Sequence, residues 1–251
     1  MARITASTFT GPFRRAVRVR GANARVELED ARFSGPVSAV GVDGGHAEVR
    51  RAEAEGGRGS AFSVVEGSML LHHVRVTGHE FGLSAMRARS LDVRDFTSVR
   101  AERAGLGLAQ SRGVLEDVVV RDSGAFGGIQ LVGGDMEVRR FTVEGAAEYG
   151  LTALQGKLRV RGGTVTRVSS KGGDGDGLHL RQVDADVEGV VVRDASGGVR
   201  AGRAGRARGA TRRGAGGLPA RGHLGGRARE GGGHGRGGPW RRDGAGGHGR
   251  R

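Results

Sequence analysis

The sequence predicts an all-β protein, a right-handed parallel β-helix (solenoid) of about nine coils of ~22 residues, followed by a disordered Arg/Gly-rich tail. Three observations lead to this prediction. Short apolar segments alternate with period two, these segments recur at a nearly constant spacing, and both features stop close to residue 199. Alternation with period two is typical of strands, and a repeat of about 20 to 50 residues is typical of solenoids.

Each repeat begins with an apolar pair, passes through further apolar residues and a glycine-rich turn, and ends in a small-apolar-x-apolar segment. Met136 and Val138, for example, lead into Gly150-Leu151-x-Ala153. Successive final segments are 21 to 23 residues apart, except for one interval of 27; their anchor residues are Val17, Val40, Phe62, Leu83, Leu106, Ile129, Leu151, Leu178 and Val199. No stretch has sustained helical spacing, so we expect strands stacked into three parallel sheets around one apolar core.

The repeat resembles that of the right-handed parallel β-helix proteins of the pectate-lyase-like superfamily, over residues 2–200. A leucine-rich-repeat horseshoe has a similar period, but it requires an L-x-x-L-x-L run and a column of asparagines, and residues 1–199 contain only Asn23. The resemblance implies an extracellular or cell-surface protein. It says little about activity, because one fold supports many functions.

The composition changes at the end of the repeats, which predicts a β-helix over 1–199 and a Gly/Arg/Ala-rich tail over 200–251. The segment Val199–Arg251 has 14 arginines and only two acidic residues, so it carries +12 of the net charge of +14. One interpretation is a nucleic-acid-binding tail. The other is out-of-frame translation of a GC-rich gene, because most tail residues have G or C in the middle codon position. In that case the solenoid is truncated.

The composition also excludes several classes of protein. The chain has no cysteine, which excludes disulfides and thiolate zinc sites. The first residues lack the apolar core of a signal peptide, and no apolar run reaches the roughly 20 residues of a membrane span. We therefore expect no export signal in this chain and no membrane span.

One coil is longer than the others and carries the first candidate site. Between Val165 and Leu178 its sequence runs TRVSSKGGDGDG, which adds about five residues to the repeat. We expect Asp174 and Asp176 to lie in a loop beside the strand that carries His179. The enzymes that the repeat resembles place their sites on strand faces and adjoining loops, where carboxylates bind Ca²⁺ or act as acid and base. The candidate catalytic residues are Asp174, Asp176 and His179, with Lys171 or Arg181 as the basic group; Asp174 and Asp176 are also the candidate metal ligands. An Asp-Gly-Asp-Gly run is equally an ordinary turn. The complete Asn-Thr-Asp, Asp-Asp and Gly-His-Gly set of polygalacturonases is absent: the chain has no Asn-Thr-Asp or Asp-Asp, and residues 1–199 have no Gly-His-Gly.

A second candidate surface is a stripe of outward residues between the paired apolar positions of the final segments. These residues are small or polar: Gly41, Ser63, Ser84, Gly107, Gln130, Thr152 and His179. Phe81, Phe126 and Tyr149 lie near the edge of this stripe. A sugar chain along the rod would contact these aromatic residues together with Gln130 and Thr152. The alternative is that the aromatic residues only cover the ends of the coils.

A third row consists of consecutive charged residues on neighbouring coils: Glu29-Asp30, Arg50-Arg51, His72-His73, Arg94-Asp95, Glu116-Asp117 and Arg139-Arg140. The signs tend to alternate from coil to coil, which predicts a cross-strand charge ladder that fixes register. We do not expect a metal at His72-His73, because adjacent residues on a strand point in opposite directions.

The leading functional hypothesis is a non-catalytic β-helix module that binds glycans or other surfaces. The first alternative is a polysaccharide lyase or glycoside hydrolase that uses Asp174, Asp176 and His179. The second alternative is nucleic-acid binding through the basic tail. Ca²⁺ is the only cofactor that the sequence suggests.

Overall fold

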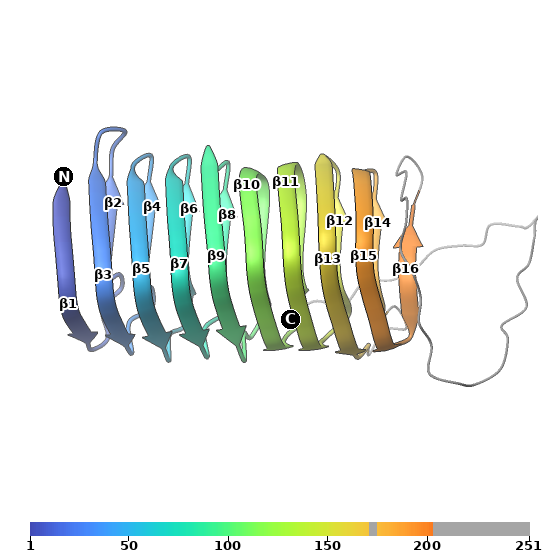
Figure 1. Cartoon of the computed structure of the whole chain (residues 1–251). Coiled ribbons are helices and arrows are strands. Elements are labelled where there is room, and N and C mark those ends of the chain that lie inside the picture. Colours follow the sequence, from blue (N-terminus) through green and yellow to red (C-terminus); the bar gives the residue numbers. More distant parts are fainter. Residues whose placement is uncertain (171–174, 203–251) are drawn as a thin grey trace, which may run out of the picture. The chain divides into compact units, whose positions relative to one another are not determined.

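The computed structural model describes residues 1–170 and 175–202, and these residues form a parallel β-solenoid (Figure 1). Figure 1 shows the coils side by side in chain order, from β1 to β16. All described strand pairs are parallel and belong to one hydrogen-bonded system of 16 strands. The described residues contain no helix, and therefore none that could cross a membrane. The predicted fold class is confirmed; residues 203–251, which include nearly all of the predicted tail, lie outside the described ranges.

Each coil contains one long and one short strand segment. The long strands are β1 (Ala2–Thr10), β3 (Arg25–Ser34), β5 (His46–Glu55), β7 (Ser68–Thr77), β9 (Ser90–Val99), β13 (Lys157–Val168) and β15 (Asp184–Ala195). The short strands are β2 (Val17–Arg20), β4 (Val40–Asp43), β6 (Ser60–Val65), β8 (Phe81–Met86), β12 (Tyr149–Leu154), β14 (Asp176–Arg181) and β16 (Gly197–Ala201). In β10 (Ala104–Ser123) and β11 (Gly127–Ala146) the short and long segments are continuous.

The long strands bend at a residue in the left-handed backbone region. Asp30, Arg51 and His73 have φ values of 55°, 52° and 56°. At each of these corners the alternation of buried and exposed residues is interrupted, so that two consecutive side chains point outward. Each long strand therefore contributes to two faces of the coil, and the short strand forms the third.

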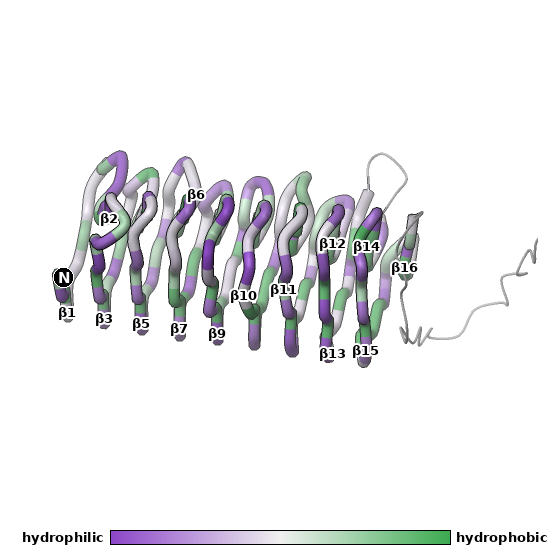
Figure 2. Tube along the Cα trace, turned by 90° about the horizontal axis from the view of Figure 1, so that it is seen from above, coloured by the Kyte–Doolittle hydropathy of each residue, from purple (hydrophilic) through white to green (hydrophobic). Residues whose placement is uncertain are grey.

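The core lies between these three faces and runs along the stack. Its largest fully buried side chains include Phe33, Phe62, Phe96 and Phe141. Equivalent apolar residues of successive coils pair in register, as Leu71 does with Val93. Figure 2 shows apolar and polar residues alternating along the coils. Burial of each such side chain stabilises the fold by about 1.5–3 kcal/mol, so the strength of the solenoid comes from repetition.

Glycine stands immediately before most of the apolar anchors of the short strand segments because the core is narrow there. A Cβ atom at Gly105 would lie 2.5 Å from a methyl carbon of Val120, and one at Gly150 would lie 2.3 Å from Val165. These glycines therefore allow the short strand to approach the long strand that follows it. This contact explains why glycine recurs immediately before the apolar anchors in the sequence.

Candidate functional site on the short-strand face

The polar stripe predicted from the sequence is one continuous column on the short strands. Register pairs connect its members from coil to coil in the order Arg18, Gly41, Ser63, Ser84, Gly107, Gln130, Thr152, His179 and Arg200. The column gains two arginines that the sequence prediction did not include. Arg200 belongs to it because β16 continues to Ala201 and pairs with β14.

Longer side chains cover parts of this column. A Cβ atom at Gly41 would lie 2.9 Å from Cδ of Arg15, and one at Gly107 would lie 2.9 Å from the ring of Phe81. Thr152 is buried, with 3% of its surface exposed. Gln130 remains partly exposed. The stripe is therefore not a flat polar strip, because aromatic and basic side chains lie over some of its smallest residues.

Phe81 and Phe126 form a cluster with Arg103, a residue that sequence reasoning missed. The two ring centroids are 6.3 Å apart. The guanidinium carbon of Arg103 lies 4.4 Å from the centroid of Phe126 and 5.2 Å from that of Phe81, within the range of a cation–π contact. Arg103 is exposed and forms no ion pair with any described residue. The cluster therefore presents a cation held by two rings.

The repeat contains a signal that predicts the position of Arg103 beside Phe126. Arg103 and Phe126 both stand three residues before their anchors, Leu106 and Ile129. Equivalent positions in successive coils lie side by side, and the amide of Phe126 donates a hydrogen bond to the carbonyl of Arg103 at 2.9 Å. Aligning the turns as well as the strands would have placed these two side chains together.

A second cluster lies on the same face and contains Asp176, His179 and Tyr149. Asp176 begins β14 and is 2% exposed. Its Oδ2 atom is 2.9 Å from Nδ1 of His179 and 3.6 Å from Nε of Arg200. The imidazole of His179 packs against the ring of Tyr149, with centroids 4.9 Å apart.

The space for the Asp176 carboxylate is created by the next coil. A Cβ atom at Gly197 would lie 2.0 Å from Oδ1 of Asp176. Asp176 is thus a buried strand residue with nitrogen partners, whereas the sequence prediction placed it in a loop. That prediction was wrong on position because the strand starts two residues earlier than the anchor Leu178 suggested.

The structure brings only part of the predicted catalytic set together. Asp176 and His179 are in contact. Arg181 is exposed at the end of β14, where it pairs with Leu154 in register. Lys171 and Asp174 lie outside the described residues.

The partners of Asp176 bear on the calcium prediction. Its carboxylate faces nitrogen donors of His179 and Arg200, and an arginine is always cationic. No group of three acidic or histidine side chains suited to a metal occurs within the described ranges. Asp174, the other predicted ligand, is not among these residues, so calcium binding stays a prediction.

The charge ladder runs along the corners of the long strands. Arg51 donates hydrogen bonds to Asp30 at 2.7 and 3.0 Å and also contacts Glu29. These bonds from Arg51 hold the pKa values of both carboxyl groups below their usual range. Arg140 bridges Glu116 and Asp117 in the same way, and its hydrogen bond lowers the pKa of Asp117.

The corner at His73 corrects the expectation that His72 and His73 point in opposite directions. His72 and His73 both point outward, because the left-handed backbone of His73 interrupts the alternation. They still do not form a pair: Nδ1 of His73 lies 2.6 Å from Asp95, and Nε2 of His72 lies 3.5 Å from Asp92.

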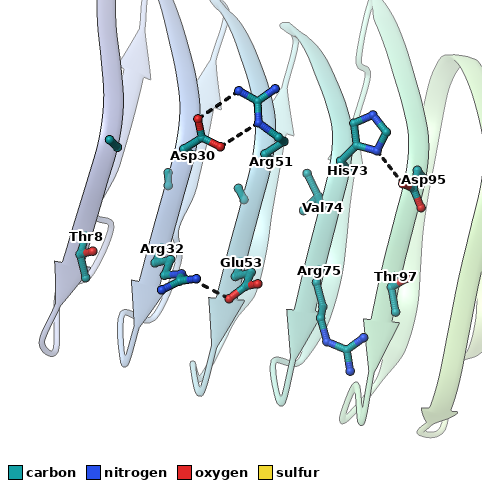
Figure 3. Close-up of a pocket in the computed structure, with 13 residues that line it drawn as sticks. Thr8, Asp30, Arg32, Arg51, Glu53, His73, Val74, Arg75, Asp95 and Thr97 are labelled. Carbon is teal, nitrogen blue, oxygen red and sulfur yellow. Dashed lines mark hydrogen bonds and ion pairs between the residues drawn. The ribbon is translucent and has the colours of Figure 1, made fainter.

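A groove of about 580 Å³ follows these corners across β1, β3, β5, β7 and β9 (Figure 3). Figure 3 shows Arg51 facing Asp30, Arg32 facing Glu53 and His73 facing Asp95, while Arg75 points away from them. Most of the charged groups in this groove are therefore neutralised by a neighbour on the next coil. We interpret the groove as a consequence of the ladder and place the candidate site on the short-strand face.

Comparisons with protein-family models, with curated proteins and with solved structures find no match.

Proposed function

We propose that the protein binds a glycan chain along its short-strand face as a non-catalytic β-helix module. The observation that carries the proposal is the column on the short strands, in which Ser63, Ser84, Gln130 and His179 are half-buried polar residues, together with the aromatic clusters Phe81–Arg103–Phe126 and Tyr149–His179 beside it. Aromatic rings supply apolar area for the faces of sugar rings, and the polar column supplies hydrogen bonds to hydroxyl groups. The resemblance of the repeat to the pectate-lyase-like superfamily is in keeping with this ligand class.

The charges on this face favour a glycan that carries anionic groups. Arg103, beside the middle of the column, has no acidic partner among the described residues, and neither does Arg18, which begins the column. A carboxylate or sulfate group can accept two parallel hydrogen bonds from one guanidinium group. Arg103 among the aromatic rings and Arg18 at the start of the column would therefore contact such a chain over several coils.

A glycan array probed with the full-length protein tests the proposal. We expect binding to a subset of acidic glycans, weakened about tenfold by Phe81→Ala and by Phe126→Ala, which corresponds to about 1.4 kcal/mol for each ring. Phe13→Ala is the matched control, because Phe13 is an exposed phenylalanine outside the two clusters. Absence of binding to every glycan, or equal losses in all three variants, would contradict the proposal.

A second candidate function is polysaccharide cleavage at Asp176 and His179, and their 2.9 Å contact favours it. When His179 donates its Nδ1–H to the buried carboxylate, Nε2 becomes available as a general base. In an eliminative cleavage this base removes the proton beside a uronate carboxylate, the C–C double bond forms, and the glycosidic oxygen leaves with its electron pair. Arg200, which lies beside Asp176, supplies positive charge for the uronate.

The ultraviolet absorbance of unsaturated uronate products measures this reaction directly. We expect Asp176→Asn and His179→Gln to lose product formation, whereas Arg181→Gln keeps it because Arg181 is exposed at the strand end. Binding of acidic glycans without any such product would restrict the protein to the first proposal.

A further inference from the structure

His79 is a buried histidine in the turn that leads into β8. Only 1% of its surface is exposed. It shares a column with small residues of neighbouring coils, and a Cβ atom at Gly57 would lie 2.2 Å from its ring. The coil before it thus accommodates the imidazole only because position 57 has no side chain.

Neither ring nitrogen of His79 has a hydrogen-bond partner among the described residues. Burial lowers the pKa of the imidazole. The nearby carbonyl of Gly59 raises this pKa, but it already accepts the amide of Glu80 at 3.0 Å and counteracts the lowering only in part. A buried imidazole without partners is tolerated when neutral, whereas its protonated form would be a buried charge.

The charged residues of the adjoining turns do not compensate that charge. They are Glu55 and Arg58 on the preceding coil, Glu80 on the same coil, and Arg100, Glu102 and Arg103 on the following coil. Glu80 is half-exposed and the others are exposed. None of them forms a hydrogen bond with the ring, and their signs are mixed.

The backbone around His79 holds the first aromatic cluster in place. Its carbonyl accepts the amide of Glu102 at 2.9 Å, and the carbonyl of Glu80 accepts the amide of Arg103 at 3.0 Å. Phe81 follows directly in the chain. The positions of Phe81 and Arg103 are thus both fixed through the same two-residue turn.

We infer that His79 is an acid-sensitive switch for the ligand site: its protonation displaces the turn 79–80 and separates Phe81 from Arg103. This inference rests on the proposed function, because it assigns regulation to the same short-strand face. The protein then binds its ligand near neutral pH and releases it in mildly acidic surroundings.

The direction of the pH effect follows from proton binding. The unfolded or opened turn binds a proton with the ordinary pKa of 6.5, and the closed turn binds it only at lower pH. The closed state is therefore fully favoured above pH 6.5 and is lost as the pH falls from there towards the lowered pKa. Within this window the equilibrium for opening rises by up to about tenfold per pH unit.

Amide hydrogen exchange of the full-length protein, corrected for the intrinsic pH dependence of exchange, measures this opening without any ligand. We expect protection of the amides of Glu102, Arg103 and Phe126 to fall by up to about tenfold per unit below pH 6.5, while β13 and β15 keep theirs. His79→Ala gives position 79 the same side chain as Ala101 of the following coil, and it abolishes this loss of protection. His79→Leu does the same and retains more volume. His73→Ala, an exposed histidine of the same coil, leaves the loss unchanged.

Several outcomes would overturn the inference. They are protection of the wild type that is independent of pH, a loss that spreads equally over all coils, and a loss that persists in the folded His79 variants. If neither variant folds, the wild-type pattern decides alone. A glycan array at pH 7.5 and pH 5 separates the two proposals: no glycan at either pH refutes the binding function, whereas equal binding at both refutes the switch.

Discussion

Two rows of the same solenoid use arginine in opposite ways. On the corners of the long strands, Arg51 and Arg140 each bridge two acidic residues of the preceding coil. On the short-strand face, Arg103 lies over two aromatic rings and has no acidic partner among the described residues. The difference teaches that a charge shared between coils contributes to register, whereas a charge held by aromatic rings remains available for a ligand.

The largest expected effect separates the core from the two surface rows. Phe96 is fully buried, and Phe96→Ala should lower the free energy of unfolding by about 3–5 kcal/mol. Because it destabilises the coil as a whole, it should weaken both the ion pairs of the ladder and ligand binding on the short-strand face. Phe81→Ala removes a half-buried ring from the short-strand face and should reduce binding with a smaller loss of stability. Urea unfolding of both variants, with the glycan array, measures this. Equal losses of stability would mean that Phe81 belongs to the core.

The next effect distinguishes a ligand-facing arginine from a structural one. Arg103→Gln should weaken glycan binding about tenfold, and this difference should shrink as salt is added, because exposed charges are screened. Arg75→Gln is the matched control, since Arg75 is exposed in the corner groove and points away from its charged neighbours. An equal loss of binding in both variants would place the ligand elsewhere.

Acid should act on the two rows in separate pH ranges. Opening at His79 begins below pH 6.5. The ladder carboxylates, with ordinary pKa values of 4.5 and 3.8 for Glu29 and Asp30, have lowered pKa values in the folded protein. Their contribution is therefore present above about pH 4.5 and is lost as the pH falls through the lowered values. Urea midpoints measured from pH 8 to pH 3 should show two steps. His79→Ala reduces the upper step, of which a part remains because burial also lowers the pKa of His46, and Arg51→Met reduces the lower step.

The smallest effect belongs to the ladder at neutral pH. Arg140→Met should reduce the urea midpoint slightly, because Arg140 and Asp117 are exposed and solvent screens their interaction, although the side chain of Glu116 is largely buried. The reduction should disappear in high salt. A large, salt-independent loss would instead show that the aliphatic part of Arg140 packs against the coil.

The sequence predicted the solenoid and the polar column because both depend on backbone period alone. The anchors from Val17 to Val199 fall in register, and so do all residues of the predicted stripe. A strand spacing that repeats in every coil turns a position in the sequence directly into a position on the surface.

The clusters were harder to predict because they depend on turns and on side-chain directions. The contact of Arg103 with Phe81 crosses a turn whose geometry does not appear in the period. The outward direction of both His72 and His73 depends on a left-handed corner that an alternating pattern hides. His79 stands between glycine and glutamate, which is the composition of an exposed turn, yet its side chain is buried.

The left-handed corners have a consequence for how the surface of such a solenoid can change in evolution. Non-glycine residues in this region cost about 1–2 kcal/mol of backbone strain, so Asp30, Arg51 and His73 hold a conformation that glycine would adopt freely. Glycine does occupy the corner at Gly162 and Gly189, and there the cation is Arg161, one residue before the corner, which pairs with Asp186 and Glu188 of the next coil. The same bend accepts either kind of residue, so substitutions at a corner can change the exposed side chains of one coil without changing its buried residues. A solenoid built in this way can diversify coil by coil.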